Sequence, residues 1–210
     1  MPETAVSDAL MEAFVIEGGR PLSGSIRAAG NKNAALPIIA AALLADEPVT
    51  LTNVPTIRDV ETMLELVADL GVEVEPVADG AVRIHATDLR KHELDEELCT
   101  RIRASILLAG PLLARFGEAI VPPPGGDVIG RRRLDTHIHA FAQLGAQIRA
   151  NRRFHMRAER LVGAPLFLDE ASVTGTENAI MAATLAQGET IIANAACEPH
   201  VQDLCRFLVS

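Results

Sequence analysis

The sequence is poor in aromatic residues, with no Trp, no Tyr and only six Phe among 210 positions. Proteins that hold single-stranded nucleic acid commonly stack the bases on aromatic side chains, and few such platforms are available here. The formal net charge is −9, from 19 basic and 28 acidic residues, which also disfavours adhesion to nucleic acid or to an anionic membrane. We therefore expect neither nucleic acid nor membrane as a partner, and any anionic ligand must meet a local cluster of cations.

Cysteine and long apolar runs are also scarce. The three cysteines, Cys99, Cys197 and Cys205, have no metal-ligand spacing and predict neither a disulfide framework nor a metal site. The longest apolar run, 34–45, is too short to cross a bilayer. Because the first residues are acidic where a secretory signal is basic, we predict a cytoplasmic protein with residues 1–13 as an irregular extension.

What is present is typical of a soluble globular protein. Apolar residues make up 49% and charged residues 22%, with 15 Gly and 12 Pro. This composition argues against a disordered or collagen-like chain. The length allows one large domain or two small ones, either of which would bury a core.

An internal repeat organises the chain. The segment 41–53 matches 182–194 without a gap, at an offset of 141 (182 − 41). A weaker copy at 112–120 matches part of the first segment at an offset of 69 (114 − 45), and the Leu-Gly pair at 70–71 is echoed at 144–145. Ordered matches of this kind predict repeated units of about 70 residues.

Each unit has the pattern helix, strand, helix, strand, strand. In the first unit we expect a helix capped by the amide of Asn33, a strand at 49–51 and a second helix from Asp59. A hairpin should then pair 72–74 with 82–84, after Leu-Gly stops the second helix. The fold class is therefore α/β. At the offset of 141, residue 210 falls inside the second helix of a third unit, so we expect a truncated unit and a longer parent protein.

Two stretches carry chemistry next to turns. Lys32, two residues after Gly30, stands at the start of the first helix, where backbone amides and an ammonium suit a phosphate or carboxylate, although a solvated lysine before a capped helix would look the same. The Pro- and Gly-rich stretch 122–130 reads as an exposed loop that could close as a lid. Its single protonable group, Asp127, is a candidate general acid or, alternatively, a turn-forming aspartate.

Two further stretches suit a polyanion. Arg131, Arg132 and Arg133 concentrate three guanidiniums in an acidic chain, and such planar groups bind phosphates or a diphosphate. The stretch 169–178 repeats the loop-then-helix pattern of the lysine loop in the third unit. We expect these parts to converge on one ligand, while a plain solvated arginine face stays the alternative.

These motifs together resemble the UDP-N-acetylglucosamine 1-carboxyvinyltransferase family of enolpyruvyl transferases. The resemblance runs from about Phe14 to the last residue and rests on the ordered segments 31–37, 103–105, 110–117, 124–132, 143–146 and 177–179. It implies two inverse α/β barrel domains, each of three repeated units, and about twice this length. Residues 14–30 would then be an N-terminal strand region belonging with an absent second domain, and 31–210 an incomplete first barrel whose third unit is truncated.

The resemblance implies transfer of enolpyruvyl from phosphoenolpyruvate to the 3′-hydroxyl of UDP-N-acetylglucosamine, the first committed step of peptidoglycan synthesis. It implies two small-molecule substrates and no cofactor or metal. The fragment alone should be inactive. Matched position by position, the catalytic residue is Asp127 and the phosphoenolpyruvate-binding residues are Lys32, Asn33 and Arg132. The matched UDP-N-acetylglucosamine-binding residues are Arg103, Arg132, Arg133, Leu134, Asp135, Thr136, Ser172 and Val173.

Two positions depart from the family pattern. Asp127 stands where most members have a cysteine, the nucleophile that the epoxide fosfomycin alkylates, and a carboxylate is a far weaker nucleophile. Glu170 stands where some relatives have a lysine near the diphosphate. The alternatives are an enolpyruvyl transferase acting on shikimate 3-phosphate, whose lysine loop usually continues differently, and a non-catalytic UDP-sugar-binding remnant.

Overall fold

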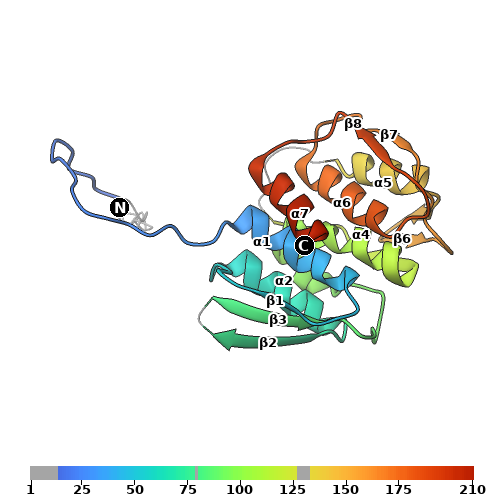
Figure 1. Ribbon diagram of the computed structural model, residues 1–210, viewed down its shortest axis with the longest axis horizontal. Helices are drawn as coiled ribbons and strands as arrows, with labels where there is room; N and C mark the ends of the chain where they lie inside the picture. The colour runs from blue at the N-terminus through green and yellow to red at the C-terminus, as the bar shows by residue number, and fades with distance from the viewer. Residues whose placement is uncertain (1–13, 79, 127–132) are drawn as a thin grey trace, which may run out of the picture.

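The computed structural model describes residues 14–78, 80–126 and 133–210, which form a mixed α/β fold (Figure 1). The longer helices are α1 (Lys32–Ala41), α2 (Arg58–Asp69), α3 (Glu96–Arg101), α5 (Asp135–Gln143), α6 (Val173–Thr184) and α7 (Pro199–Val209). A continuous helical stretch comprises the 3-10 helix η2 (Arg103–Leu108), α4 (Ala109–Pro111) and the π-helix η3 (Leu112–Phe116), and a 3-10 turn η1 (Ala42–Leu44) extends α1. The strands are β1 (Val49–Leu51), β2 (Glu73–Ala78), β3 (Ala81–His85), β4 (Glu118–Val121), β5 (Gln147–Ala150), β6 (Phe154–Arg157), β7 (Pro165–Phe167) and β8 (Ile191–Ala193).

Two of the sheets have the same topology. The first is antiparallel in the order β1-β3-β2, and the second is antiparallel in the order β4-β6-β5. A third, two-stranded sheet pairs β7 with β8 in parallel. The predicted strand at 49–51 and the hairpin pairing of β2 with β3 are confirmed, while Asp79 in its turn lies outside the described residues.

Helix α2 shows how the sequence pattern becomes structure. Val60, Met63 and Val67 fall on one face at helical spacing and are buried, as the periodicity predicts. The helix ends before Gly71, whose φ of 99° lies in the left-handed region that glycine adopts without strain. Gly145, after α5, has the same φ of 99°. The predicted Leu-Gly stop is therefore confirmed.

The cap of α1 differs from the prediction. Asn31, rather than Asn33, is the N-cap, and its Oδ1 accepts hydrogen bonds from the amides of Asn33 at 2.7 Å and Ala34 at 3.1 Å. An N-cap side chain must reach amides two or three residues ahead, and the helix begins at Lys32, so only Asn31 has that reach. Asn33 is thereby left on the first turn, with its side chain available to a ligand.

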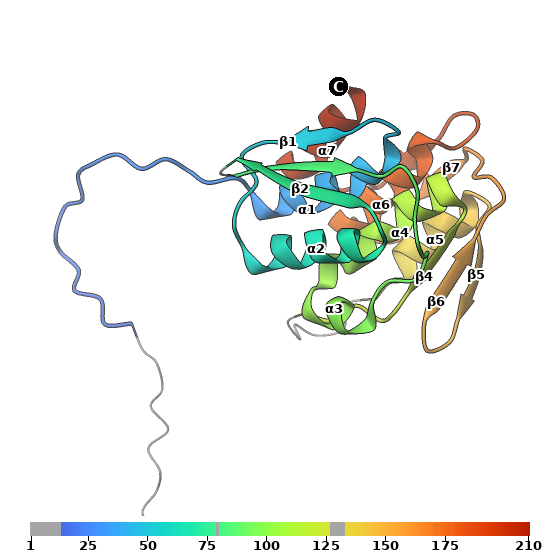
Figure 2. The same ribbon diagram turned by 90° about the horizontal axis from the view of Figure 1, so that it is seen from below.

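The core lies between the central helices, with the sheets at the periphery (Figures 1 and 2). Ile39 of α1, Leu108 of η2 and Met181 of α6 are fully buried there. Helices α4 and α6 approach so closely that a Cβ on Gly110 would lie 2.8 Å from Asn178 Oδ1. No helix in the described ranges is long and apolar enough to cross a membrane.

The segment 14–30 leaves the folded body as an extended tail (Figures 1 and 2). It forms neither helix nor strand, and its apolar side chains Phe14, Leu22 and Ile26 are 97% exposed or more. A strand needs a neighbour to bind its backbone amides and carbonyls, and no strand of the described chain lies beside this segment. Its assignment to a second domain stays a prediction.

Candidate functional site

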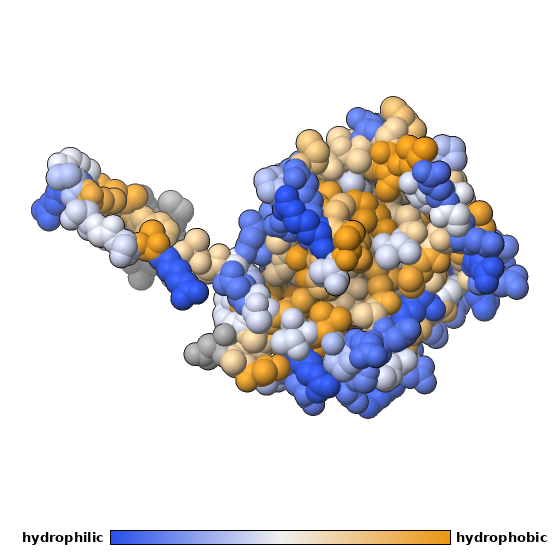
Figure 3. Space-filling model, in the orientation of Figure 1, coloured by the Kyte–Doolittle hydropathy of each residue, from blue (hydrophilic) through white to orange (hydrophobic). Residues whose placement is uncertain are grey.

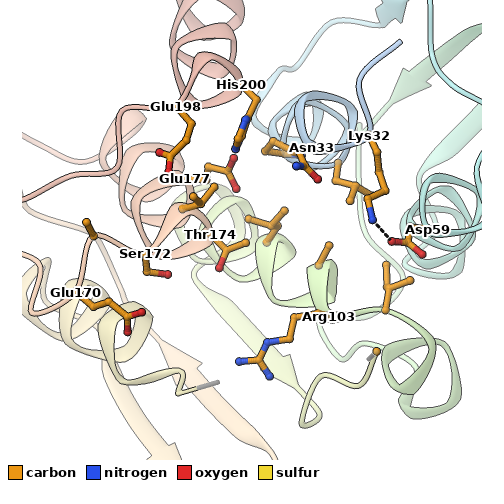
Figure 4. Close-up of a pocket in the computed structure, with 18 of the residues that line it drawn as sticks. Lys32, Asn33, Asp59, Arg103, Glu170, Ser172, Thr174, Glu177, Glu198 and His200 are labelled. Carbon is orange, nitrogen blue, oxygen red and sulfur yellow. Dashed lines mark hydrogen bonds and ion pairs between the residues drawn. The ribbon is translucent and has the colours of Figure 1, made fainter. Parts of the chain in front are cut away.

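A cavity of about 810 Å³ opens where the first turns of α1, α2, η2, α6 and α7 meet (Figure 4). Most of its polar wall is charged or carries hydroxyl and amide groups, from Lys32, Asn33, Asp59, Arg101, Arg103, Arg133, Glu170, Ser172, Thr174, Glu177, Glu198 and His200. Because helix N-termini present unpaired amides and a partial positive charge, this convergence favours an anion.

Cations reach the cavity from three separate parts of the sequence. Lys32 Nζ lies 2.9 Å from Asp59 Oδ2, and both side chains are partly exposed. Arg103 lines the wall at the start of η2. Arg133 donates from Nε to Asp135 Oδ2, and this carboxylate raises the pKa of the guanidinium. Folding therefore gathers cations from distant parts of this acidic sequence around one cavity, in addition to the arginines that are neighbours in the sequence.

The structure brings six of the predicted site residues to the cavity wall: Lys32, Asn33, Arg103, Arg133, Ser172 and Val173. Leu134, Asp135 and Thr136 are described but do not line the cavity. Asp135 holds Arg133, and Thr136 Oγ1 donates to Asp169 Oδ1 at 2.7 Å, which lowers the pKa of Asp169. Asp127 and Arg132 lie outside the described residues, so their roles stay predictions.

The base of the predicted lid is anchored beside the cavity. The amide of Gly125 donates to Cys99 O at 2.9 Å, and that of Gly126 to Thr100 O at 3.1 Å. A Cβ on Gly125 would lie 1.9 Å from Thr100 O, so only glycine permits this approach. These two glycines thus serve a close backbone contact, and the loop closure inferred from them stays a prediction.

A buried carboxyl stands in the same wall. Glu177 of α6 is 1% exposed, and its Oε1 has no hydrogen-bond partner among the described residues. Burial, and then the nearby Glu198 carboxylate, raise the pKa of Glu177 to about 8. At neutral pH Glu177 is therefore mostly a neutral acid that can donate a hydrogen bond into the cavity.

Four polar lining residues were not singled out in the sequence, Asp59, Arg101, Glu198 and His200, while Thr174 and Glu177 fall in the stretch 169–178 without having been named as site residues. A signal for individual residues existed. The repeat offset of 141 pairs Asn33 with Thr174 and Asp59 with His200, and all four line the cavity. The same offset pairs the two N-caps, Asn31 and Ser172. Extending the repeat from hydrophobic residues to polar ones would have picked out Thr174 within the stretch 169–178 and would have found His200.

The fold and cavity define an α/β protein whose charged cavity lies where helix N-termini and arginines converge. The described residues contain no group of three or more His, Cys, Asp or Glu placed to hold a metal ion. The sequence model of the EPSP synthase (3-phosphoshikimate 1-carboxyvinyltransferase) family matches residues 16–210. The chain belongs to this family.

The chain also matches curated proteins at high sequence identity. The chain is 62% identical over 197 residues to a UDP-N-acetylglucosamine 1-carboxyvinyltransferase of Bradyrhizobium diazoefficiens, covering 94% of this chain and 46% of the relative. A protein of the same name from Treponema denticola is 55% identical over 198 residues, with 94% and 46% covered. The resemblance inferred from the motifs is confirmed. The chain spans about half the length of the curated relatives it matches.

Solved structures show the same fold. The enolpyruvyl transferase NikO from Streptomyces tendae matches with a TM-score of 0.78 at 22% identity, covering 91% of this chain and 45% of that one. EPSP synthase from Acinetobacter baumannii matches with a TM-score of 0.68 at 20% identity, covering 85% and 42%. At these identities the likeness concerns the fold alone.

Proposed function

We propose that this chain forms part of an enzyme that transfers enolpyruvyl from phosphoenolpyruvate to the 3′-hydroxyl of UDP-N-acetylglucosamine and releases phosphate. One observation carries the proposal. The cations at family motif positions, Lys32, Arg103 and Arg133, converge with the N-terminus of α6 on one cavity. Both substrates are anionic, and their charge calls for such groups. The names of the curated relatives support the same acceptor.

In this proposal the two substrates bind different parts of the cavity wall. Lys32 and Asn33, on the first turn of α1, bind phosphoenolpyruvate together with Arg132. Arg103, Arg133 and the amides at the start of α6 hold the diphosphate and uridine of the acceptor, together with Leu134, Asp135 and Thr136, and Asp135 also holds Arg133. Asp127 delivers the proton that the methylene carbon needs as the hydroxyl attacks, which is a general-acid role. The enzyme would act in the cytoplasm in peptidoglycan synthesis, and so in cell shape and division.

We also propose that the chain is an inverse α/β barrel of three repeated units with its third unit incomplete. The identical strand order of the first two sheets supports it. So do the left-handed residues Asn53 and Asn194, which lie at the 141 offset and share a φ of 56°. In this arrangement 31–210 is one domain, and 14–30 belongs with a second domain in the parent protein.

The test is turnover by the complete protein encoded with this sequence. Purified enzyme is mixed with phosphoenolpyruvate and UDP-N-acetylglucosamine, and phosphate release is followed, with shikimate 3-phosphate as the competing acceptor. Lys32→Ala should lower kcat/KM by about 100-fold, the order expected for a lost charge-assisted contact in a transition state. Lys91→Ala is the matched control, because Lys91 pairs with Asp69 rather than lining the cavity.

The outcomes separate the candidates. Turnover only with shikimate 3-phosphate would replace the proposed acceptor. Binding of UDP-N-acetylglucosamine without turnover would indicate a non-catalytic binding protein. An unchanged kcat/KM in Lys32→Ala would contradict the role of the lysine.

A further inference from the structure

A buried polar chain lies behind the cavity, and it begins at Asn178 of α6. The amide of Gly110 donates to Asn178 Oδ1 at 2.9 Å, and Asn178 Nδ2 donates to Ile106 O at 2.9 Å. Both partners are backbone groups with fixed roles, so the orientation of this side-chain amide is determined. Asn178 is fully buried, and a 180° flip of its amide would place a donor against the Gly110 amide and an acceptor against the Ile106 carbonyl.

The oriented amide in turn selects the tautomer of His137. The second hydrogen of Asn178 Nδ2 lies against His137 Nδ1, with the two nitrogens 2.9 Å apart. Nδ1 must therefore accept, so the imidazole is neutral and carries its proton on Nε2. Burial, and to a smaller extent the charge of Arg103, lower the pKa of His137 to about 4, in agreement with a neutral ring.

The last member of this hydrogen-bonded series of side chains is a hydroxyl on the cavity wall. His137 Nε2 lies 3.3 Å from Thr174 Oγ1, so Nε2–H donates and the hydroxyl oxygen accepts. The Thr174 hydrogen is then left to donate elsewhere, and no acceptor for it is found in the described part of the chain. Figure 4 shows Thr174 between Ser172 and Arg103, at the start of α6.

We propose that Thr174 binds an anionic oxygen of the ligand through its hydroxyl, which the Asn178–His137 pair holds as a hydrogen-bond donor. His137 and Asn178 are positioning residues, and Thr174 makes the contact. A second observation points to a ligand at this wall: Glu177, one turn further along α6, lines the same cavity with a buried and unpartnered oxygen. The acidic neighbours Glu170 and Glu198 line the cavity too, with Arg103 and His200.

The diphosphate is the part of the ligand that fits. A donor hydroxyl beside an arginine and a helix N-terminus is suited to phosphate oxygens, and its held orientation lowers the entropic cost of binding. This assignment rests on the proposed function for the identity of the whole ligand. The contact itself requires only a phosphate-type oxyanion, so pyrophosphate serves as an independent probe.

The first experiment measures binding of pyrophosphate and of UDP-N-acetylglucosamine to this chain by titration calorimetry. Thr174→Val keeps the shape of the side chain without its hydroxyl and should weaken both affinities about tenfold, the range for a hydrogen bond to a charged group. Thr174→Ser keeps the hydroxyl and should stay within about twofold of the parent. Thr184→Val is the matched control, because Thr184 lies exposed on α6 and bonds to Ile180 O.

Each result decides one claim. Pyrophosphate binding that depends on Thr174, without UDP-N-acetylglucosamine binding, would support the contact and count against the proposed function. Binding of UDP-N-acetylglucosamine unaffected by Thr174→Val would overturn the contact and leave the function standing. Absence of binding by both probes would overturn the contact.

The second experiment reads the positioning role directly. Nitrogen-15 NMR at neutral pH should show His137 with an unprotonated Nδ1 and a protonated Nε2, and Asn178→Ala, if folded, should release this preference. Thr174→Val should leave the tautomer unchanged, since Asn178 rather than Thr174 selects it. A protonated Nδ1 in the parent protein would overturn the proposal without any ligand being present.

Discussion

Lys32 and Asp59 form an ion pair across one wall of the cavity, with Nζ 2.9 Å from Oδ2. The lysine comes from the first turn of α1 and the aspartate from the first turn of α2. The carboxylate positions the ammonium, yet it also occupies the charge that an anionic substrate would use. Both side chains are partly exposed, so the pair contributes only on the order of 0.2–1 kcal/mol.

Asp59→Asn should therefore strengthen phosphoenolpyruvate binding. The asparagine can still accept a hydrogen bond from Lys32 but no longer neutralises it, and loss of a pair of this strength corresponds to about two- to fivefold in Kd. The change should shrink at high salt, where exposed charges are screened. Calorimetric titration of parent and variant at low and high salt tests this, and weaker binding by the variant would contradict it.

Asn178→Ala should destabilise the fold by about 3 kcal/mol. The substitution leaves the buried Gly110 amide and His137 Nδ1 without their partner, and each orphaned group costs on the order of 1–3 kcal/mol, whereas the Ile106 carbonyl keeps its bond from the Ala109 amide. Urea unfolding followed by circular dichroism measures the loss. The exposed Asn151→Ala is the control and should change the free energy of unfolding by less than about 0.5 kcal/mol. Equal effects of the two variants would show that the buried hydrogen bonds of Asn178 contribute nothing to the free energy of unfolding.

Glu177→Gln should stabilise the protein increasingly as pH rises. The folded protein holds the proton of Glu177 up to a pKa of about 8, whereas the unfolded carboxyl ionises near 4.5. Native protein binds more protons between these values, so the parent loses stability from about pH 4.5 to 8 and the glutamine variant does not. His137, whose pKa of about 4 lies below its ordinary 6.5, acts oppositely but equally in both proteins.

The measurement is the difference in unfolding free energy between variant and parent at pH 5 and pH 8. We expect this difference to grow by about 2 kcal/mol or more, consistent with a shift of more than one pKa unit. Glu189→Gln, at an exposed position, is the control and should show no growth. A difference independent of pH would mean that Glu177 is ionised in the folded state.

Asp127→Cys should make the complete enzyme sensitive to fosfomycin. A thiolate can open the epoxide, whereas the parent carboxylate is too weak a nucleophile, so the parent should resist inactivation. Asp127→Asn cannot deliver a proton and should lose about 100-fold in kcat, in the range of general-acid catalysis. Time-dependent inactivation of the parent enzyme, or near-parental turnover by Asp127→Asn, would remove the assigned role.

Features set by neighbouring residues were predictable from the sequence. The strand β1, the buried face of α2 and the stop at Gly71 follow from hydrophobic spacing and from the left-handed freedom of glycine. The position of Lys32 at the start of α1 was also predictable, because a lysine beside a helix start is a local arrangement, and its role toward an anion stays a prediction. The choice between Asn31 and Asn33 as the cap was missed, since it depends on one residue in the helix boundary.

The tertiary structure alone decided which distant side chains share a wall. Glu177 reads as an ordinary helix residue, and only the packing of α6 against its neighbours removes it from water and makes it a neutral acid. The hydrogen-bond network that links Asn178, His137 and Thr174 depends on backbone groups that lie 68 and 72 positions from Asn178 in the sequence. Hydrophobic spacing encodes which face of a helix is buried, but a polar residue acquires its partner, its tautomer and its charge only when packing brings that partner within hydrogen-bond reach.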